Sequence, residues 1–404
     1  MGSLSNAAKR LALRVSSITG KIIMENKIPY QHLSVMIIPT DFCNMNCVYC
    51  FNGRRREAED KKMTEATLRR IFEITLPYYR EIRYIFHGGE PLLAGIQFYK
   101  EVIRLEKELN VNNCHITNSV QTNLSLMSKE YAEFFVKNHF HIGSSYDGIR
   151  NEETRHNSAG IMSGYDHLKE AGGKCGFIYV VQARNILHLI EDYEWFKSEG
   201  KSFTLNVYLA NSDEPDDPLK VDASVMASKI AELFDYWLLD KDCNISIFYF
   251  EHFVRYILFK EKSLCCYNSC LGKHVGFRFD GEIFNCNRDF PADMSFGNVY
   301  QYTDIHECFQ SVGFNNLLSK AIIRRRHCKE ICEIYNFCSG GCNSAALASG
   351  DIEKENAFVC SVLKDVYSHI QIVLNDIVRL DNEDSEKYCP YVKKSLEEYW
   401  TLGI

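Results

Sequence analysis

The sequence has no apolar run near its N-terminus as long as a signal-peptide core or a membrane span. Residues 1–24 instead alternate basic and apolar side chains, which predicts an amphipathic leading helix. The chain also lacks a basic excess, since its formal net charge is −7. These absences predict a soluble, cytoplasmic protein with no membrane partner and no nucleic-acid partner. The dense basic runs, 54–56 and 324–326, are interpreted as solvated faces, although either could meet an acidic peptide or an electron donor.

Cysteine, by contrast, is abundant, with 17 residues in a chain of 404. Without a secretory signal, so many thiols do not indicate a disulfide framework, and metal ligation is favoured. The first patterned group is Cys43-x3-Cys47-x2-Cys50, in which three thiolates can close on one metal cluster. Three cysteines leave one iron open to chelation by a small molecule. A zinc loop that borrows a distant fourth ligand is the alternative.

Strand-like and helical patterns alternate along the first half of the chain, which predicts an α/β fold. The apolar strand-like runs are 32–39, 82–86, 115–121, 139–144, 176–182 and 203–209. Helical spacing occurs at 64–79, with Thr64 as N-cap, and at 98–109, 129–137, 187–198, 225–239 and 250–259. The cysteine loop follows the first strand, which is where α/β barrels place their chemistry.

A second motif, His87-Gly88-Gly89-Glu90-Pro91, follows the second strand. Glycines allow a backbone to approach a ligand closely, and the Glu90 carboxylate can accept a hydrogen bond from an ammonium group. Taken alone, such a tripeptide is usually a turn. Its position one βα unit after the cysteine loop gives it more weight.

Together, Cys43-x3-Cys47-x2-Cys50 with Tyr49 before the last cysteine resembles the signature of the radical S-adenosylmethionine (SAM) enzymes. The resemblance implies a partial (β/α)6 TIM-like barrel and a [4Fe–4S] cluster whose unique iron binds SAM. Tyr49 would lie near the adenine. The other residues implied as SAM contacts are Gly88, Gly89, Glu90, Thr122, Asn123, Ser145 and Arg155.

The match is looser between Ser145 and Arg155. The segment reads Ser145-Tyr146-Asp147-Gly148. Related enzymes usually carry proline directly after this glycine, whereas this chain has Ile149 and fewer residues before Arg155. Ser145 would contact the ribose or methionyl part of SAM, and Arg155 its carboxylate. An ordinary surface arginine is the alternative for Arg155.

The later cysteines resemble the SPASM extension of radical SAM peptide-modifying enzymes, which holds two auxiliary [4Fe–4S] clusters. The pattern includes a hairpin over 277–284, turned at Asp280-Gly281. The first auxiliary cluster is expected on Cys270, Cys286 and Cys342, with Cys265 or Cys266 completing it. The second is expected on Cys328, Cys332, Cys338 and Cys360. Zinc is the alternative metal.

One spacing departs from the SPASM pattern, because three residues separate Cys328 from Cys332 where the family usually has two. We therefore expect a one-residue bulge there. Five cysteines fall outside all motifs and are interpreted as small buried hydrophobes: Cys114, Cys175, Cys243, Cys308 and Cys389.

These patterns suggest five segments. They are a helical segment (1–30), the radical SAM barrel (31–212), a helical bridge (213–264), the SPASM domain with its hairpin and helices (265–364), and a helical tail (365–404). About thirty residues precede the first strand, so we expect no N-terminal leader-binding module.

The resemblance implies a net two-electron oxidation of a peptide or protein C–H site, with a flavodoxin- or ferredoxin-type electron donor. Sulfatase-maturating enzymes commonly have a basic aspartate directly after the cysteine matching Cys286, but this chain has Asn287 there, with Asp289 as a candidate base. That difference favours the branch that crosslinks ribosomally made peptides by thioether, ether or C–C bonds. The alternatives are formylglycine formation in a sulfatase and a non-catalytic iron–sulfur carrier.

Overall fold

The computed structural model describes residues 30–51, 61–210, 216–263, 270–286, 291–380 and 385–402. Several predicted features lie outside these residues: the leading helix, the basic run 54–56, Cys265, Cys266, Asn287 and Asp289. Two compact units divide the chain. The first unit comprises 1–42, 55–119 and 270–323, and the second comprises 43–54, 120–269 and 324–404.

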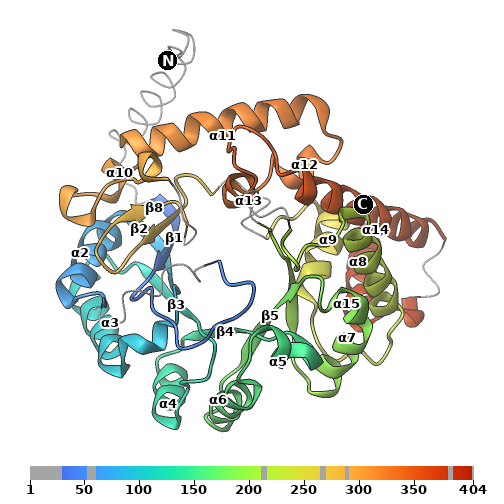
Figure 1. The fold of residues 1–404 in the computed structure, drawn as a ribbon, viewed down its shortest axis with the longest axis horizontal. Helices are drawn as coiled ribbons and strands as arrows, with labels where there is room; N and C mark the ends of the chain where they lie inside the picture. Colours follow the sequence, from blue (N-terminus) through green and yellow to red (C-terminus); the bar gives the residue numbers. More distant parts are fainter. Residues whose placement is uncertain are drawn as a thin grey trace. The chain divides into compact units, whose positions relative to one another are not determined.

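The strands form a sheet whose order is β6-β5-β4-β3-β2-β1-β7-β8. Their bounds are β1 (Tyr30–Ile37), β2 (Tyr79–Phe86), β3 (His115–Gln121), β4 (His141–Ser145), β5 (Cys175–Val181), β6 (Phe203–Val207), β7 (His274–Phe277) and β8 (Ile283–Phe284). In the first unit β1 pairs in parallel with β2 and β7, and in the second unit β5 pairs in parallel with β4 and β6. The predicted α/β class with successive parallel strands is confirmed (Figure 1).

In the first unit, α2 (Glu65–Thr75) and α3 (Ile96–Leu109) accompany β1 and β2 (Figure 1). The predicted cap is present, because the Thr64 hydroxyl accepts a hydrogen bond from the Thr67 amide at 3.1 Å. Alternate side chains of β1 and one face of α2 are fully buried, as their periodicity requires. They are Leu33, Val35, Ile37, Leu68, Ile71 and Phe72.

The hairpin of β7 and β8 also belongs to the first unit, and the two strands pair antiparallel. Gly281 has φ +86°, and its amide donates to the Arg278 carbonyl at 2.9 Å. The predicted turn at Asp280-Gly281 is therefore confirmed. Two helices follow the hairpin, α10 (Ile305–Cys308) and α11 (Val312–Ile331), and α11 continues into the second unit.

The second unit is mainly helical outside its strands. Its helices are α4 (Lys129–Lys137), α5 (Asn151–Thr154), α6 (Ser158–Glu170), α7 (Leu189–Ser198), α8 (Ala223–Leu238), α9 (Phe248–Phe259), α12 (Tyr335–Cys338), α13 (Asn343–Ala348), α14 (Ala357–Leu380) and α15 (Pro390–Leu402). Among the described residues one helix, α14, is long and apolar enough to cross a membrane by length and composition alone. Its buried side chains, including Val366 and Ile370, are those of a helix packed on α8 and α9.

One sequence interpretation needs correction on α11. Residues 324–326 were expected to form a solvated face, but Arg324 is only 1% exposed. Arg326, two residues later, is exposed as expected. A charge run on a helix therefore contributes to both faces here, because successive residues turn by about 100°.

Candidate functional site

The three-cysteine loop occupies the start of the second unit, directly after the residues that follow β1. Cys43, Cys47 and Cys50 are all half-buried, and the Cys50 amide donates to the Cys47 carbonyl at 3.1 Å. The Val48 amide donates to the Thr154 carbonyl at 2.9 Å, which anchors the loop to the end of α5. The motif is thus held by main-chain contacts while its thiols stay accessible to a ligand.

Asn123, after β3, reaches the first cysteine of the loop. Its side-chain amide donates to Asn44 Oδ1 at 2.9 Å and lies 3.8 Å from Cys43 Sγ. Thr122 is 3% exposed, and its hydroxyl accepts from the Leu124 amide at 3.1 Å. The structure therefore places Asn123 beside the three-cysteine loop, whereas the Thr122 side chain shapes the turn after β3.

A buried network joins Tyr49 to the segment after β4. The Tyr49 hydroxyl donates to Asp147 Oδ2 at 2.6 Å and accepts from Arg155 Nη1 at 2.9 Å. Asp147 also accepts from the Thr154 hydroxyl at 2.7 Å and from the Val180 amide at 3.0 Å. Asp147 was not among the site residues predicted from the sequence. Its full burial marks it as the centre of the network.

The charges of this network are strongly coupled. Burial raises the pKa of Asp147, and Arg155 opposes that rise. Burial also raises the pKa of Tyr49 well above its usual value, and Asp147 adds to the effect. For Arg155, burial lowers the pKa, but Tyr49, Cys47 and Asp147 outweigh it, so the guanidinium stays charged.

Arg155 is suited to hold an anion. It is only 8% exposed, which excludes the surface-arginine alternative, and its Nε is buried without a hydrogen-bond partner. An unsatisfied buried guanidinium N–H is costly, and a carboxylate would satisfy it. The residues present therefore fit the predicted SAM carboxylate. Ser145 is half-buried in β4, and its hydroxyl lies 3.4 Å from the Gln121 side-chain amide.

The looser part of the motif has a physical explanation. The Ile149 amide donates to Asp192 Oδ1 at 2.8 Å, a bond that proline could not make. Asp192 also accepts from the Tyr179 hydroxyl at 2.7 Å. A Cβ on Gly148, which has φ +62°, would lie 2.2 Å from the same Asp192 oxygen. Asp192 thus fixes the segment leading to Arg155 in place of the proline.

In the first unit, the Gly88-Gly89-Glu90 loop packs on the residues just before Cys43. The Gly89 amide donates to the Thr40 carbonyl at 3.1 Å, and the Glu90 amide donates to the Phe42 carbonyl at 2.8 Å. A Cβ on Gly89 would lie 2.1 Å from the Phe42 carbonyl oxygen. Glu90 is fully buried, and its Oε1 accepts from the Leu92 amide at 2.9 Å. Glycine is required here by the close approach of two backbones.

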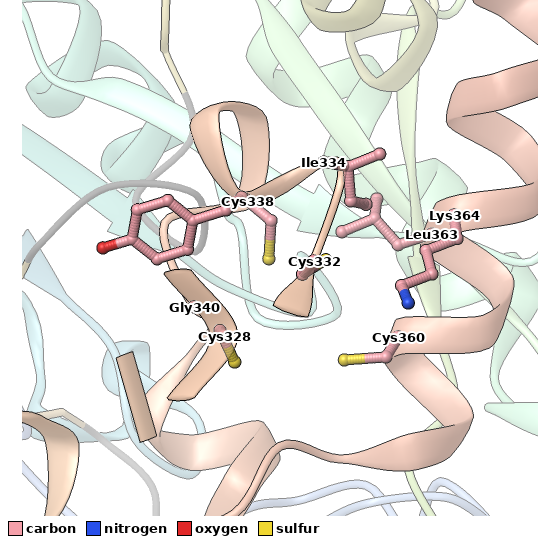
Figure 2. Close-up of a pocket in the computed structure, with 9 residues that line it drawn as sticks. Cys328, Cys332, Ile334, Cys338, Gly340, Cys360, Leu363 and Lys364 are labelled. Carbon is pink, nitrogen blue, oxygen red and sulfur yellow. The ribbon is translucent and has the colours of Figure 1, made fainter. Parts of the chain in front are cut away.

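Four cysteines of the later motif line one cavity in the second unit, shown in Figure 2. They are Cys328, Cys332, Cys338 and Cys360, the set predicted for the second auxiliary cluster. Cys342 does not line it. The figure also shows the Lys364 side chain extending into this cavity from α14, beside Cys360.

The expected bulge between Cys328 and Cys332 is wrong. The Cys332 amide donates to the Cys328 carbonyl at 2.9 Å, as in an α-helical turn at the end of α11. Residues four apart lie on the same helix face, so the extra residue turns both thiols the same way. The longer spacing is accommodated by helix rather than by an irregular loop.

The arrangement of thiols bears on the choice of metal. A tetrahedral zinc site with Zn–S near 2.3 Å needs sulfurs roughly 3.8 Å apart. Within the described part of the chain, no three His, Cys, Asp or Glu side chains lie close enough to hold one metal ion. Burial raises the pKa of Cys338 to about 11 and of Cys360 to about 12, so these thiols ionise near neutral pH only with a metal partner.

The remaining cysteines divide by burial and by unit. Cys270 and Cys286 are half-buried in the first unit, where Asn285 Nδ2 donates to Cys270 Sγ at 3.4 Å. Cys342 precedes α13 in the second unit. Of the cysteines interpreted as small hydrophobes, Cys114, Cys308 and Cys389 are buried, whereas Cys175 and Cys243 are half-buried.

Comparisons with known proteins find several relatives of this chain. The model of the radical SAM superfamily matches residues 37–196. A cysteine-type anaerobic sulfatase-maturating enzyme of Clostridium novyi is 26% identical over 332 residues, covering 77% of this chain and 87% of the relative. A serine-type enzyme of Bacteroides thetaiotaomicron is 24% identical, covering 84% and 89%. A protein of Methanothermobacter thermautotrophicus is 31% identical over 226 residues, covering 54% and 80%.

Solved structures have the same fold. Native anSMEcpe with bound AdoMet and the Cp18Cys peptide superposes with a TM-score of 0.74 at 24% identity, covering 85% of this chain and 99% of that one. Streptococcus suis SuiB bound to S-adenosylmethionine gives a TM-score of 0.59 at 16% identity, covering 89% and 84%.

Proposed function

Because the chain belongs to the radical SAM superfamily, we propose that it oxidises a cysteine side chain of a protein substrate to formylglycine. The family implies one [4Fe–4S] cluster and SAM, and the ligands would be Cys43, Cys47 and Cys50. The observation that carries the proposal is the extent of the similarity to sulfatase-maturating enzymes. It spans 87% of the Clostridium novyi enzyme, beyond the superfamily segment alone.

This proposal reverses the order of the two branches expected from the sequence. Asn287 in place of the usual aspartate favoured crosslinking of ribosomal peptides. The relatives named above instead favour the sulfatase-maturating alternative. The likeness to SuiB is one of fold, at 16% identity, and gives crosslinking no specific support.

The bound cluster and SAM would supply a 5′-deoxyadenosyl radical, which takes a hydrogen atom from the substrate carbon. Arg155 would pair with the SAM carboxylate, and the backbone and carboxylate of Gly88-Gly89-Glu90 would bind its amino group. Asn123 would orient the loop at Cys43, to which it is adjacent. Tyr49 would cover the adenine while its hydroxyl keeps Arg155 in place. Positioning of this kind confines the radical to one carbon.

Oxidation of the cysteine to an aldehyde releases two electrons, one of them after hydrogen abstraction. We propose that two auxiliary [4Fe–4S] clusters accept that electron. One would sit on Cys328, Cys332, Cys338 and Cys360, and the other on Cys270, Cys286 and Cys342 with Cys265 or Cys266. A flavodoxin- or ferredoxin-type protein would supply the first electron. Asp289 is proposed as the base that removes the substrate thiol proton.

The test uses anaerobically reconstituted protein with SAM, a low-potential reductant and two matched peptides from a sulfatase active-site segment, one with cysteine and one with serine. The cysteine peptide should exchange its sulfur and two hydrogens for a carbonyl oxygen, and the product should react with hydroxylamine. Preference for the serine peptide would indicate the serine-type activity instead.

Loss of two hydrogens without an aldehyde would indicate a crosslink and would refute formylglycine formation. Absence of 5′-deoxyadenosine with every peptide would refute the radical reaction itself. The D289N variant tests the base: it should lose aldehyde formation while it still cleaves SAM. The N287D variant serves as its control and should retain activity.

A further inference from the structure

Arg324 is a cationic side chain buried inside the second unit. It lies on α11, one helical turn before Cys328, and is 1% exposed. Burying a guanidinium without good partners costs several kcal/mol. Its partners should therefore explain what the arginine does.

Each arm of the guanidinium bonds to a different stretch of chain. Nε donates to the Gly340 carbonyl at 2.9 Å, Nη2 donates to Asn343 Oδ1 at 2.6 Å, and Nη1 donates to the Ile352 carbonyl. Asn343 is itself 1% exposed, so these bonds form away from water. The three nitrogens of a planar guanidinium can reach acceptors on three separate segments at once, which the single nitrogen of a lysine cannot do.

Those acceptors lie within the chain segments that carry the four-cysteine cavity. Gly340 lies two residues after Cys338, and Ile352 precedes the start of α14, which carries Cys360. Arg324 itself shares α11 with Cys328. One side chain therefore ties together every segment that contributes a thiol to the cavity.

The charge of Arg324 also lies close to the thiols, because Arg324 and Cys328 are four residues apart on the same face of α11. A [4Fe–4S] cluster with four thiolates is anionic in every oxidation state, and its potential depends on nearby charge. A cation one helical turn away stabilises the reduced, more negative form most.

We propose that Arg324 is a positioning residue that holds the cavity of Cys328, Cys332, Cys338 and Cys360 in its metal-binding arrangement before the metal arrives, and that its charge raises the potential of the bound cluster. This inference rests on the proposed auxiliary cluster at those cysteines. It assigns a function to a residue outside the cysteine motif.

The experiment compares Arg324→Met, Arg324→Lys and the exposed neighbour Arg326→Met with wild type. Iron and sulfide per chain are measured after anaerobic reconstitution, and cluster potentials by EPR-monitored titration. R324M should bind fewer irons per chain than wild type, because a fraction of its four-cysteine cavities fails to assemble a cubane of about four irons. R324K should also bind less iron, because it loses the fork, but its remaining cluster should keep the wild-type potential. The cluster that remains in R324M should titrate at a more negative potential, and R326M should match wild type.

Thermal unfolding of the metal-free proteins gives a readout independent of the clusters. Metal-free R324M should unfold at a lower temperature than metal-free wild type, because the three segments are no longer tied together. Wild-type iron content and potentials in R324M would overturn the inference.

A Cys328→Ser variant separates this failure from failure of the proposed cluster. If C328S loses about four irons while R324M loses none, only the role of Arg324 is wrong. If C328S keeps all its iron, the auxiliary cluster is wrong and the inference falls with it.

Discussion

Glu106 on α3 is a buried carboxylate whose environment predicts a pH-dependent stability. It is 8% exposed, and both its oxygens accept from Asn118 Nδ2, at 2.9 and 3.1 Å. Burial raises the pKa of Glu106 to about 7, from 4.5. The folded state therefore binds more protons than the unfolded state between these values. Its stabilising effect is present below pH 4.5 and is lost as the pH rises to 7.

The E106Q variant should remove this dependence. Its neutral amide can accept from Asn118 Nδ2 and donate to Asn118 Oδ1, which is buried without a partner. At pH 8 we expect E106Q to be more stable than wild type by up to about 3 kcal/mol, from the size of the pKa shift. At pH 4.5 the gain should vanish. Denaturant unfolding at both pH values measures this, and an equal gain at both would contradict the titration argument.

Asp147 is the residue on which the geometry of Tyr49 and Arg155 depends. An Asp147→Asn substitution keeps the size but removes the charge that Arg155 faces and weakens the acceptor of the Tyr49 hydroxyl. Loss of a charged hydrogen bond costs about 1.5–3 kcal/mol. We expect D147N to cleave SAM about 10- to 100-fold more slowly, measured as 5′-deoxyadenosine formation.

The matched control for D147N is Asp235→Asn, because Asp235 forms a partly exposed pair with His369 outside the network. D235N should cleave SAM at the wild-type rate. Equal rates in D147N and wild type would mean that Asp147 only supports the fold.

At the scale of elements, the loops that follow β1 and β2 are fitted to each other through Gly89. A methyl group there would lie 2.1 Å from the Phe42 carbonyl oxygen and 2.5 Å from the Asp41 carbonyl oxygen. Both are backbone atoms, so the residues immediately before Cys43 must shift. We expect G89A to lose SAM cleavage by at least tenfold, and to bind less iron, because displacement near a reacting centre is costly.

Gly176→Ala is the control for G89A. The nearest atom to a Cβ on Gly176 is Phe248 Cε2, at an ordinary 3.7 Å. Iron content and 5′-deoxyadenosine formation should be unchanged in G176A. Normal activity in G89A would show that the two loops can separate without harm to the cysteine loop.

The sequence predicted elements whose pattern is local and missed those decided by packing. The strand at 115–121 and the helix at 129–137 have the predicted bounds, because their periodicity and caps agree. The helix α6 (Ser158–Glu170) was not predicted. It contains two glycines, and a Cβ on Gly164 would lie 2.0 Å from the Leu124 carbonyl oxygen. The close packing of Gly164 against the Leu124 backbone therefore requires glycine at a helical position, although glycine has a low helix propensity.

The residues of the candidate site also divide into those that the local sequence pattern predicted and those that depend on packing. The resemblance of the later cysteines to the SPASM extension predicted which four thiols share a cavity. It did not predict Asp147 or Arg324, since the interior role of a charged residue depends on which segments meet around it. The spacing of Cys328 and Cys332 suggested a bulge because the helical state of α11 was not evident from its apolar pattern.

At the scale of the whole molecule, the cysteines divide into one group that is proposed to hold the SAM-binding cluster and further groups that are proposed to hold electron-relay clusters. Cys43, Cys47 and Cys50 follow the first strand, whereas the four cavity cysteines lie after Arg324. The proposed clusters should therefore be separable by mutation. We expect wild type to hold about twelve irons, four for each cubane.

The C43A variant should lose about four irons and all 5′-deoxyadenosine formation, because a cubane with two thiolates is not held and SAM has no iron to chelate. C328S should lose a similar amount of iron but still cleave SAM, and should fail to complete substrate oxidation. Cys243→Ser is the control, since Cys243 Sγ donates to the Ile245 carbonyl at 3.1 Å and a hydroxyl can replace it.

Zinc in place of iron, or 5′-deoxyadenosine formation that does not depend on Cys43, would contradict the radical mechanism. SAM cleavage lost in C328S would mean that the clusters act as one unit, because relays downstream of the radical step cannot abolish it.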